Sequence, residues 1–154
     1  MLNIFRKHKQ QLLSAEEQQH IVAAIQQAEL GTSGEIRVYV ESHCTMVHAI
    51  ERAAELFYSL KMEQTQHRNG VLVYIALKDR QMAIFGDEGI HQKVGGNDYW
   101  QRELAVLKNY FQQNKIAEGI AQCISDISKA LSSHFPYDAG TDKNELPDDI
   151  VFGH

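Results

Sequence analysis

Hydrophobic residues recur at two different intervals along the chain, and these intervals predict an alternation of helices and strands. Residues 15–29 follow helical spacing after a serine and a glutamate at capping-box positions, and Gly31 can close that helix. In "EIRVYVE", residues 35–41, apolar and polar positions alternate strictly, which predicts a first strand. Residues 46–60 return to helical spacing and predict a second helix, whose buried stripe contains Ile50, Ala53, Ala54, Phe57 and Leu60.

The second half of the pattern adds two strands and two helices. The nearly all-apolar "GVLVYIAL", residues 70–77, predicts a strand covered on both faces. Only "KDR" separates it from "QMAIF", residues 81–85, so this third strand returns as an antiparallel hairpin. Two amphipathic helices follow, and Asp98 is the predicted N-cap of the first. Their apolar stripes contain Trp100, Leu104, Leu107 and Phe111, and then Ile116, Ile120, Cys123, Ile124, Ile127 and Leu131.

These elements predict an α/β protein built as a three-layer α/β/α sandwich. Strands 1 and 2 are joined by a helix and should be parallel, while strand 3 is antiparallel to strand 2. The 154 residues suffice for one domain, which we place at residues 14–136, between an N-terminal lead (1–13) and an acidic C-terminal tail (137–154). The end of the tail, "NELPDDIVF", either packs on its own domain, which is favoured, or binds a partner as an added strand or groove peptide.

Composition and charge narrow the classes of partner. A net charge of -5 and a pI near 5.9 argue against a protein that binds the phosphate backbone, so nucleic acid is not an expected partner. No apolar run approaches the roughly 20 residues that span a bilayer, and the N-terminus lacks the apolar region of a secretory signal. We therefore expect a cytoplasmic protein without a membrane span, whose two cysteines stay reduced.

Three glycine-containing turns converge at one edge of the predicted sheet, where strands 1 and 2 start and strand 3 ends. This edge gathers the carboxylates of Glu35, Asp87 and Glu88 with the amide oxygen of Asn69. Oxygen-rich turns of this kind suit calcium or magnesium. The structural alternative is that the glycines make tight turns and Asp87 caps a short helix near residues 88–94. The local pattern taken alone favours the structural alternative.

A second group of potential ligands lies in "HCTMVH", residues 43–48. His43, Cys44 and His48 have side chains that bind zinc or copper. The alternative, a strand-to-helix loop with incidental histidines, is favoured, because His48 is expected on the second helix and no fourth ligand has a fixed position.

Several segments resemble the TPM domain family, in the same order and over about residues 12–137. They are "TSGEIRVYVES", then "RNGVLVYIALKDRQMAIFGDEGI", the helix with Trp100, "EGI" at 118–120 and "HFP" at 134–136. The family is named for a thylakoid-lumen phosphatase-like protein, a photosystem II repair protein and a modulator of acetylcholine receptors. Many relatives carry a signal peptide and a membrane anchor, whereas this chain resembles a soluble bacterial branch, so we expect neither a photosystem nor a receptor role.

The resemblance implies a Rossmann-like sandwich, divalent cation binding in some members and acid phosphatase activity in plant members. Carried over by motif, it implies Glu35, Asn69, Asp87 and Glu88 as metal positions, with Asp87 and Glu35 foremost. The predicted function is a binding module of unknown physiological role that holds calcium or magnesium weakly and engages a protein partner or a small ligand.

Two other functions remain open for this chain. One is a metal-assisted, phosphatase-like hydrolase with Asp87 as the candidate nucleophile. The other is a structural interaction domain without a cation. Catalysis is less favoured than binding, because the sequence has no P-loop, nucleophile-elbow or HExxH motif.

Overall fold

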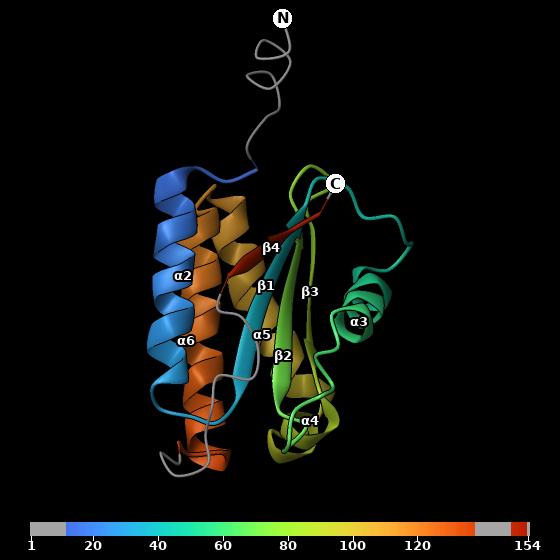
Figure 1. Ribbon diagram of the computed structural model, residues 1–154. Coiled ribbons are helices and arrows are strands. Elements are labelled where there is room, and N and C mark those ends of the chain that lie inside the picture. Colours follow the sequence, from blue (N-terminus) through green and yellow to red (C-terminus); the bar gives the residue numbers. More distant parts are fainter. Residues whose placement is uncertain (1–11, 138–148, 154) are drawn as a thin grey trace, which may run out of the picture.

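The fold is described for residues 12–137 and 149–153 in a computed structural model. Figure 1 shows a central sheet with helices on both sides. The elements are α2 Ala15–Glu29, β1 Glu35–Glu41, α3 Ala49–Ser59, β2 Gly70–Ala76, β3 Gln81–Gly86, α4 Glu88–Lys93, α5 Asn97–Gln112, α6 Ile116–His134 and β4 Ile150–Phe152. Most of the predicted N-terminal lead and the acidic middle of the predicted tail lie outside the described residues.

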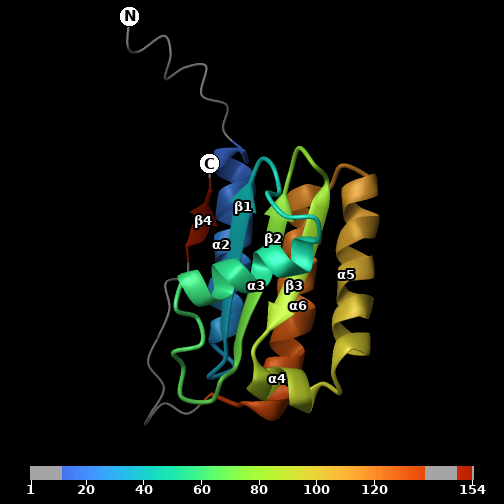
Figure 2. The ribbon, with the colours of Figure 1, turned by 90° about the vertical axis from the view of Figure 1, so that its right-hand side faces the viewer.

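The four strands form one sheet in the order β3-β2-β1-β4. β1 and β2 pair in parallel with Glu35 opposite Gly70, and β2 pairs antiparallel with β3, with Val71 opposite Gly86. The starts of β1 and β2 and the end of β3 therefore lie at the same edge, next to α4 at the bottom of Figure 2. The predicted parallel pair, the antiparallel hairpin and the convergence of the three turns are confirmed.

Helices cover both faces of the sheet, with α2, α5 and α6 on one face and α3 on the other (Figure 1). Because successive side chains of a strand point to opposite faces, the sheet supports two cores. Ile36, Val38 and Val40 of β1 pack under the three-helix layer, whereas Tyr39 packs with Phe57 under α3. In the described part of the chain, no helix combines the length and the apolar character needed to cross a bilayer.

The end of the predicted tail forms β4, which pairs in parallel with β1 and places Ile150 opposite Val38. Ile150 belongs to the larger core, and the Gly153 N–H donates to the Val40 carbonyl at 2.9 Å. The hydrophobic end of the chain therefore packs on its own domain. Since β4 covers the β1 side of the sheet, β3 is the outermost strand on the other side.

Two helices begin at other residues than the sequence predicts. α3 begins at Ala49 rather than near residue 46, after an irregular loop. The prediction that Asp98 caps α5 is wrong, because Gly96 is the N-cap and Asp98 lies in the first turn. Gly96 has a φ of 92°, which glycine adopts without strain, and Asp98 still interacts favourably with the positive end of the helix.

Candidate functional site

Asp87, the central residue of the predicted cation edge, forms a two-point ion pair with Arg68. The residue is only 2 % exposed. Its carboxylate accepts hydrogen bonds from Arg68 Nε to Oδ2 at 2.7 Å and from Nη2 to Oδ1 at 2.9 Å. The bond to Asp87 raises the pKa of Arg68, as expected for a bidentate, charge-assisted pair. Both oxygens of Asp87 are thus bonded to one cationic side chain.

Asp87 is also the N-cap of α4, as the structural alternative predicts. Its Oδ1 accepts a hydrogen bond from the Glu88 N–H at 2.8 Å, which satisfies one of the unpaired donors of the helix start. The side chain of Glu88 is 64 % exposed, and its Oε1 lies 3.3 Å from Nη1 of Arg68. The guanidinium of Arg68 therefore stands between the carboxylates of Asp87 and Glu88.

The two glycines of "GDEG" are explained by close packing. A Cβ atom at Gly86 would overlap the ring of Trp100, and a Cβ atom at Gly89 would overlap the carbonyl groups of His67 and Arg68. The Gly89 N–H donates to the Arg68 carbonyl at 2.9 Å, so the turn before β2 and the start of α4 lie in direct contact. A larger residue at Gly89 would push these two elements apart, and one at Gly86 would displace Trp100.

Glu35 and Asn69 lie at the same edge of the sheet but have different surroundings. They are 3 % and 1 % exposed. The side-chain amide of Asn69 donates to the Ser33 hydroxyl at 3.4 Å, and its Oδ1 is buried without a partner among the described residues. The strand register places Glu35 beside Gly70, with Asp87 beyond it. Glu35 and Asp87 are therefore two strands apart.

Protein atoms pack closely over Gly70, which lies between Glu35 and Asp87 in the sheet. A Cβ atom at Gly70 would lie 3.1 Å from the Met62 carbonyl oxygen and 3.5 Å from the ring of Phe57. Across residues 12–137 and 149–153, no three His, Cys, Asp or Glu side chains are grouped so as to hold a metal ion. Of the four residues predicted from the sequence, Arg68 brings together Asp87 and Glu88.

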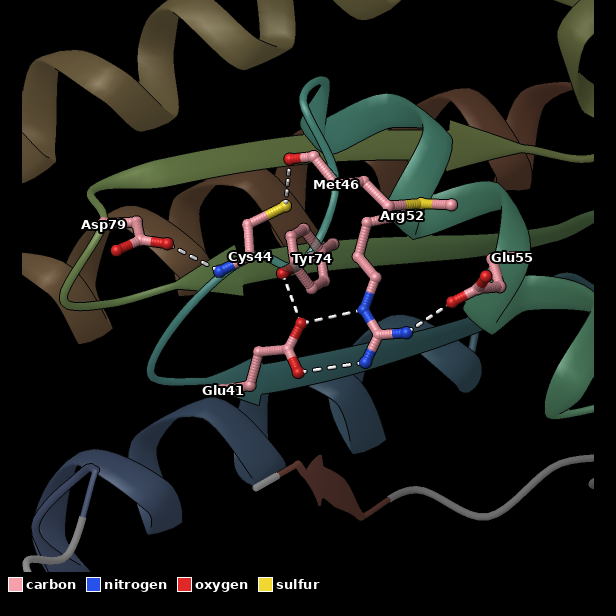
Figure 3. Close-up of polar contacts among 7 residues, drawn as sticks. All are labelled: Glu41, Cys44, Met46, Arg52, Glu55, Tyr74 and Asp79. Atoms are coloured by element: carbon pink, nitrogen blue, oxygen red, sulfur yellow. Dashed lines mark hydrogen bonds and ion pairs between the residues drawn. The ribbon is translucent and has the colours of Figure 1, made fainter.

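At the opposite edge, where β1 and β2 end, Glu41 is a buried carboxylate that no sequence motif marks (Figure 3). It is 2 % exposed, and Arg52 donates to it from Nε at 2.9 Å and from Nη2 at 3.0 Å. The Tyr74 hydroxyl also donates to Glu41, and burial together with this bond raises the pKa of Tyr74. Open α/β sheets commonly bind ligands at this edge. Here, however, the polar groups bond to one another and join α3 to the sheet.

The loop between β1 and α3 contains the other predicted ligand group. His43 Nδ1 lies 2.8 Å from Asp79 Oδ1, and the Cys44 N–H donates to Asp79 Oδ2 at 2.7 Å. The Cys44 thiol donates to the Met46 carbonyl at 3.4 Å, and His48 is the N-cap of α3. Asp79 thus joins this loop to the β2–β3 hairpin. His43, Cys44 and His48, all within the described residues, are not grouped as metal ligands.

Two carboxyl groups meet between α5 and α6. Burial, and then the charge of Asp126, raises the pKa of Glu103 from 4.5 to about 7. The folded protein therefore binds a proton that the unfolded chain releases, so the contribution of Glu103 to stability is fully present below about pH 4.5 and is lost as the pH rises through about 7.

Glu103→Gln should remove this pH dependence, because glutamine has no proton to lose. We expect its free energy of unfolding at about pH 8 to exceed that of the parent by roughly 2 kcal/mol, with little difference at about pH 4. Urea unfolding at both pH values measures this, and Glu118→Gln, at an exposed position of α6, is the control. The prediction would be contradicted if the free energy of unfolding fell by the same amount between the two pH values in Glu103→Gln and in the parent protein.

The fold and the site define an α/β/α sandwich with a mixed sheet and an ion-paired carboxylate at the edge where its two long parallel strands start. The chain belongs to the TPM domain family, whose model matches residues 7–130. The NMR structure of the BA42 protein from the psychrophilic bacterium Bizionia argentinensis is similar, with a TM-score of 0.85, 37 % sequence identity, and coverage of 96 % of this chain and 99 % of that chain.

A second solved structure shows the fold alone. The N-terminal domain of the cg2496 protein from Corynebacterium glutamicum has 15 % sequence identity and a TM-score of 0.58, over 93 % of this chain and 82 % of that chain. No curated protein matches the sequence. The match of the family model to residues 7–130 confirms the predicted resemblance to the TPM family.

Proposed function

We propose that this TPM domain is a non-catalytic binding module that binds calcium or magnesium weakly at the Asp87 edge, meaning residues 32–35, 67–70 and 86–89. The observation that supports this is the Arg68 guanidinium between the carboxylates of Asp87 and Glu88. A divalent cation and a guanidinium bind the same carboxylate oxygens, so they compete for them. Asp87 and Glu88 are the proposed first ligands, and Glu35 and Asn69 are the remaining candidates.

The expected affinity is low, on the order of 10⁻⁴ to 10⁻³ M, as in weak calcium modules. Calcium takes about six to eight oxygen ligands, and two carboxylates provide only part of this number. The cation must also displace Arg68 from a bidentate pair, which lowers the net gain. Binding of this strength suits a module that responds to large changes in cation concentration.

A calcium titration followed by backbone amide NMR shifts tests the site. We expect saturable shifts confined to the Asp87 edge. Arg68→Gln should tighten binding by about threefold to tenfold, because it removes the competing charge. Asp87→Asn should abolish binding while asparagine still caps α4. Asp79→Asn, which changes an aspartate in the β2–β3 hairpin at the opposite edge, should leave the affinity unchanged.

Two outcomes would contradict the proposed function. If the parent protein, Arg68→Gln and Asp87→Asn bound calcium equally, the cation would lie elsewhere. A carboxylate nucleophile needs an oxygen free to attack phosphorus, and both oxygens of Asp87 bond to Arg68. Hydrolysis of an aryl phosphate that survives repurification and disappears in Asp87→Asn would therefore replace the binding module with a phosphatase-like hydrolase.

A further inference from the structure

A groove of about 640 Å³ follows β3, the outermost strand of the sheet. All six residues of β3 line it. Within the described residues, the backbone of β3 pairs only with β2. Alternate residues of an antiparallel outer strand direct their N–H and C=O groups away from the neighbouring strand. Such an edge is a template for one more strand.

Helices form both walls of this groove. On one side, α5 lies alongside β3 (Figure 2) and presents one face to the groove through Asn97, Trp100, Gln101, Leu104 and Lys108. On the other side lie the end of the loop before α3, where Val47 is 85 % exposed, and the start of α3, where Ile50 is 48 % exposed. The groove therefore combines backbone groups along its floor with apolar side chains on its walls.

The charge of the groove is opposite to that of the whole chain. Its lining includes Arg80, Lys108, His48 and His91 and contains no Asp or Glu, whereas the net charge of the chain is -5. Pairing β3 with β3 of a second copy would bring like charges together, which is unfavourable. An extended segment with alternating acidic and aliphatic residues fits both the cations and the apolar walls.

We propose that this groove binds an extended acidic and aliphatic segment of a partner protein, which adds to the sheet as a strand beside β3. Backbone hydrogen bonds to β3 provide affinity, and alternate side chains provide specificity. The carboxylates of the segment pair with Arg80 and Lys108, and its aliphatic side chains pack on Ile50 and Leu104. The groove reaches Gly86 but is not lined by Asp87 or Glu88, so the proposal adds a partner to the proposed binding module and fails or succeeds independently of cation binding.

Tryptophan fluorescence tests the proposal, because Trp100 is the only tryptophan of the chain and lines the groove. The probe is an acetylated and amidated peptide of alternating glutamate and valine, with six residues to match β3. We expect a saturable change in fluorescence. Lys108→Glu should weaken binding by about tenfold. Lys129→Glu, at an exposed position of α6 outside the groove, should leave the affinity within about twofold of the parent.

Two methylated forms of the peptide test strand addition itself. Each carries N-methyl groups on one of the two alternating sets of backbone amides. Only one edge of an added strand faces β3, so one form should lose binding and the other should retain it. Equal behaviour of the two forms would overturn strand addition, as would the absence of saturable binding by the unmethylated peptide.

The remaining controls test the identity of the occupant. A peptide of alternating lysine and valine should bind at least about tenfold more weakly than the glutamate peptide. Equal affinity for the two would overturn the charge argument. Dimerisation of the parent protein in sedimentation velocity, lost in Lys108→Glu and kept in Lys129→Glu, would assign the groove to a second copy of the chain and overturn the proposed partner.

Discussion

Glu41→Ala is expected to lower the free energy of unfolding by about 3–5 kcal/mol. The substitution removes the acceptor of Nε and Nη2 of Arg52, whose side chain is 16 % exposed, and the acceptor of the buried Tyr74 hydroxyl. A buried charge or hydroxyl that loses its partner keeps the full cost of its removal from water. This loss exceeds the net contribution of the intact pair to stability.

Glu55→Ala is the matched control for Glu41→Ala. Glu55 also bonds to Arg52, but its side chain is 50 % exposed. Water can replace an exposed carboxylate, so we expect a loss below about 1 kcal/mol. Urea unfolding of both variants measures the difference. Equal losses would show that the hydrogen bonds of Glu41 with Arg52 and Tyr74 do not hold α3 on the sheet.

Gly89→Ala is expected to cost about 3 kcal/mol of stability. The new methyl group would overlap the carbonyl groups of His67 and Arg68, and backbone atoms cannot rotate away as a side chain can. The turn before β2 must therefore move, which lengthens the hydrogen bond from the Gly89 N–H to the Arg68 carbonyl.

Gly31→Ala provides the comparison for Gly89→Ala. A Cβ atom at Gly31 would lie 3.1 Å from the Ser132 hydroxyl oxygen, which can turn aside. We expect a change below about 1 kcal/mol in the same urea unfolding experiment. If the two alanine variants were equally stable, close packing would not be the reason for the second glycine of "GDEG".

The regular elements were predictable where the pattern was strong and local. Ser14 and Glu17 form the predicted capping box, with each side chain bonded to the backbone N–H of the other residue. The strict alternation of residues 35–41 gave the bounds of β1, and the short connection after residue 77 required the hairpin. These signals lie within a few residues of one another, so distant parts of the chain do not alter them.

Other features depend on contacts that no local pattern reveals. Ile50 was predicted on the buried stripe of α3, yet it is 48 % exposed. Leu56, which was not predicted on that stripe, is buried. β4 has three residues, too few for a period of two to be recognised. Glu41 was not predicted as a site because alternation shows which residues share a face but not what covers that face.

The candidate site shows the same limit. Topology alone predicted that residues 35, 70 and 87 meet at one edge. The sequence did not predict that Arg68 would bind Asp87, because this depends on a turn in which Arg68 has a φ of 50°. A backbone conformation that residues other than glycine rarely adopt cannot be inferred from "HRNG" alone.

The side-chain Nε–H signals of Arg68 and Arg52 test most directly whether a cation and Arg68 compete for Asp87. Each Nε–H donates to a carboxylate, Asp87 for Arg68 and Glu41 for Arg52. We predict that calcium moves the Arg68 signal towards that of a solvent-exposed arginine, along the same saturation curve as the amides of residues 86–89. The Arg52 signal should stay in place. Saturation of those amides without movement of the Arg68 signal would contradict the competition between calcium and Arg68.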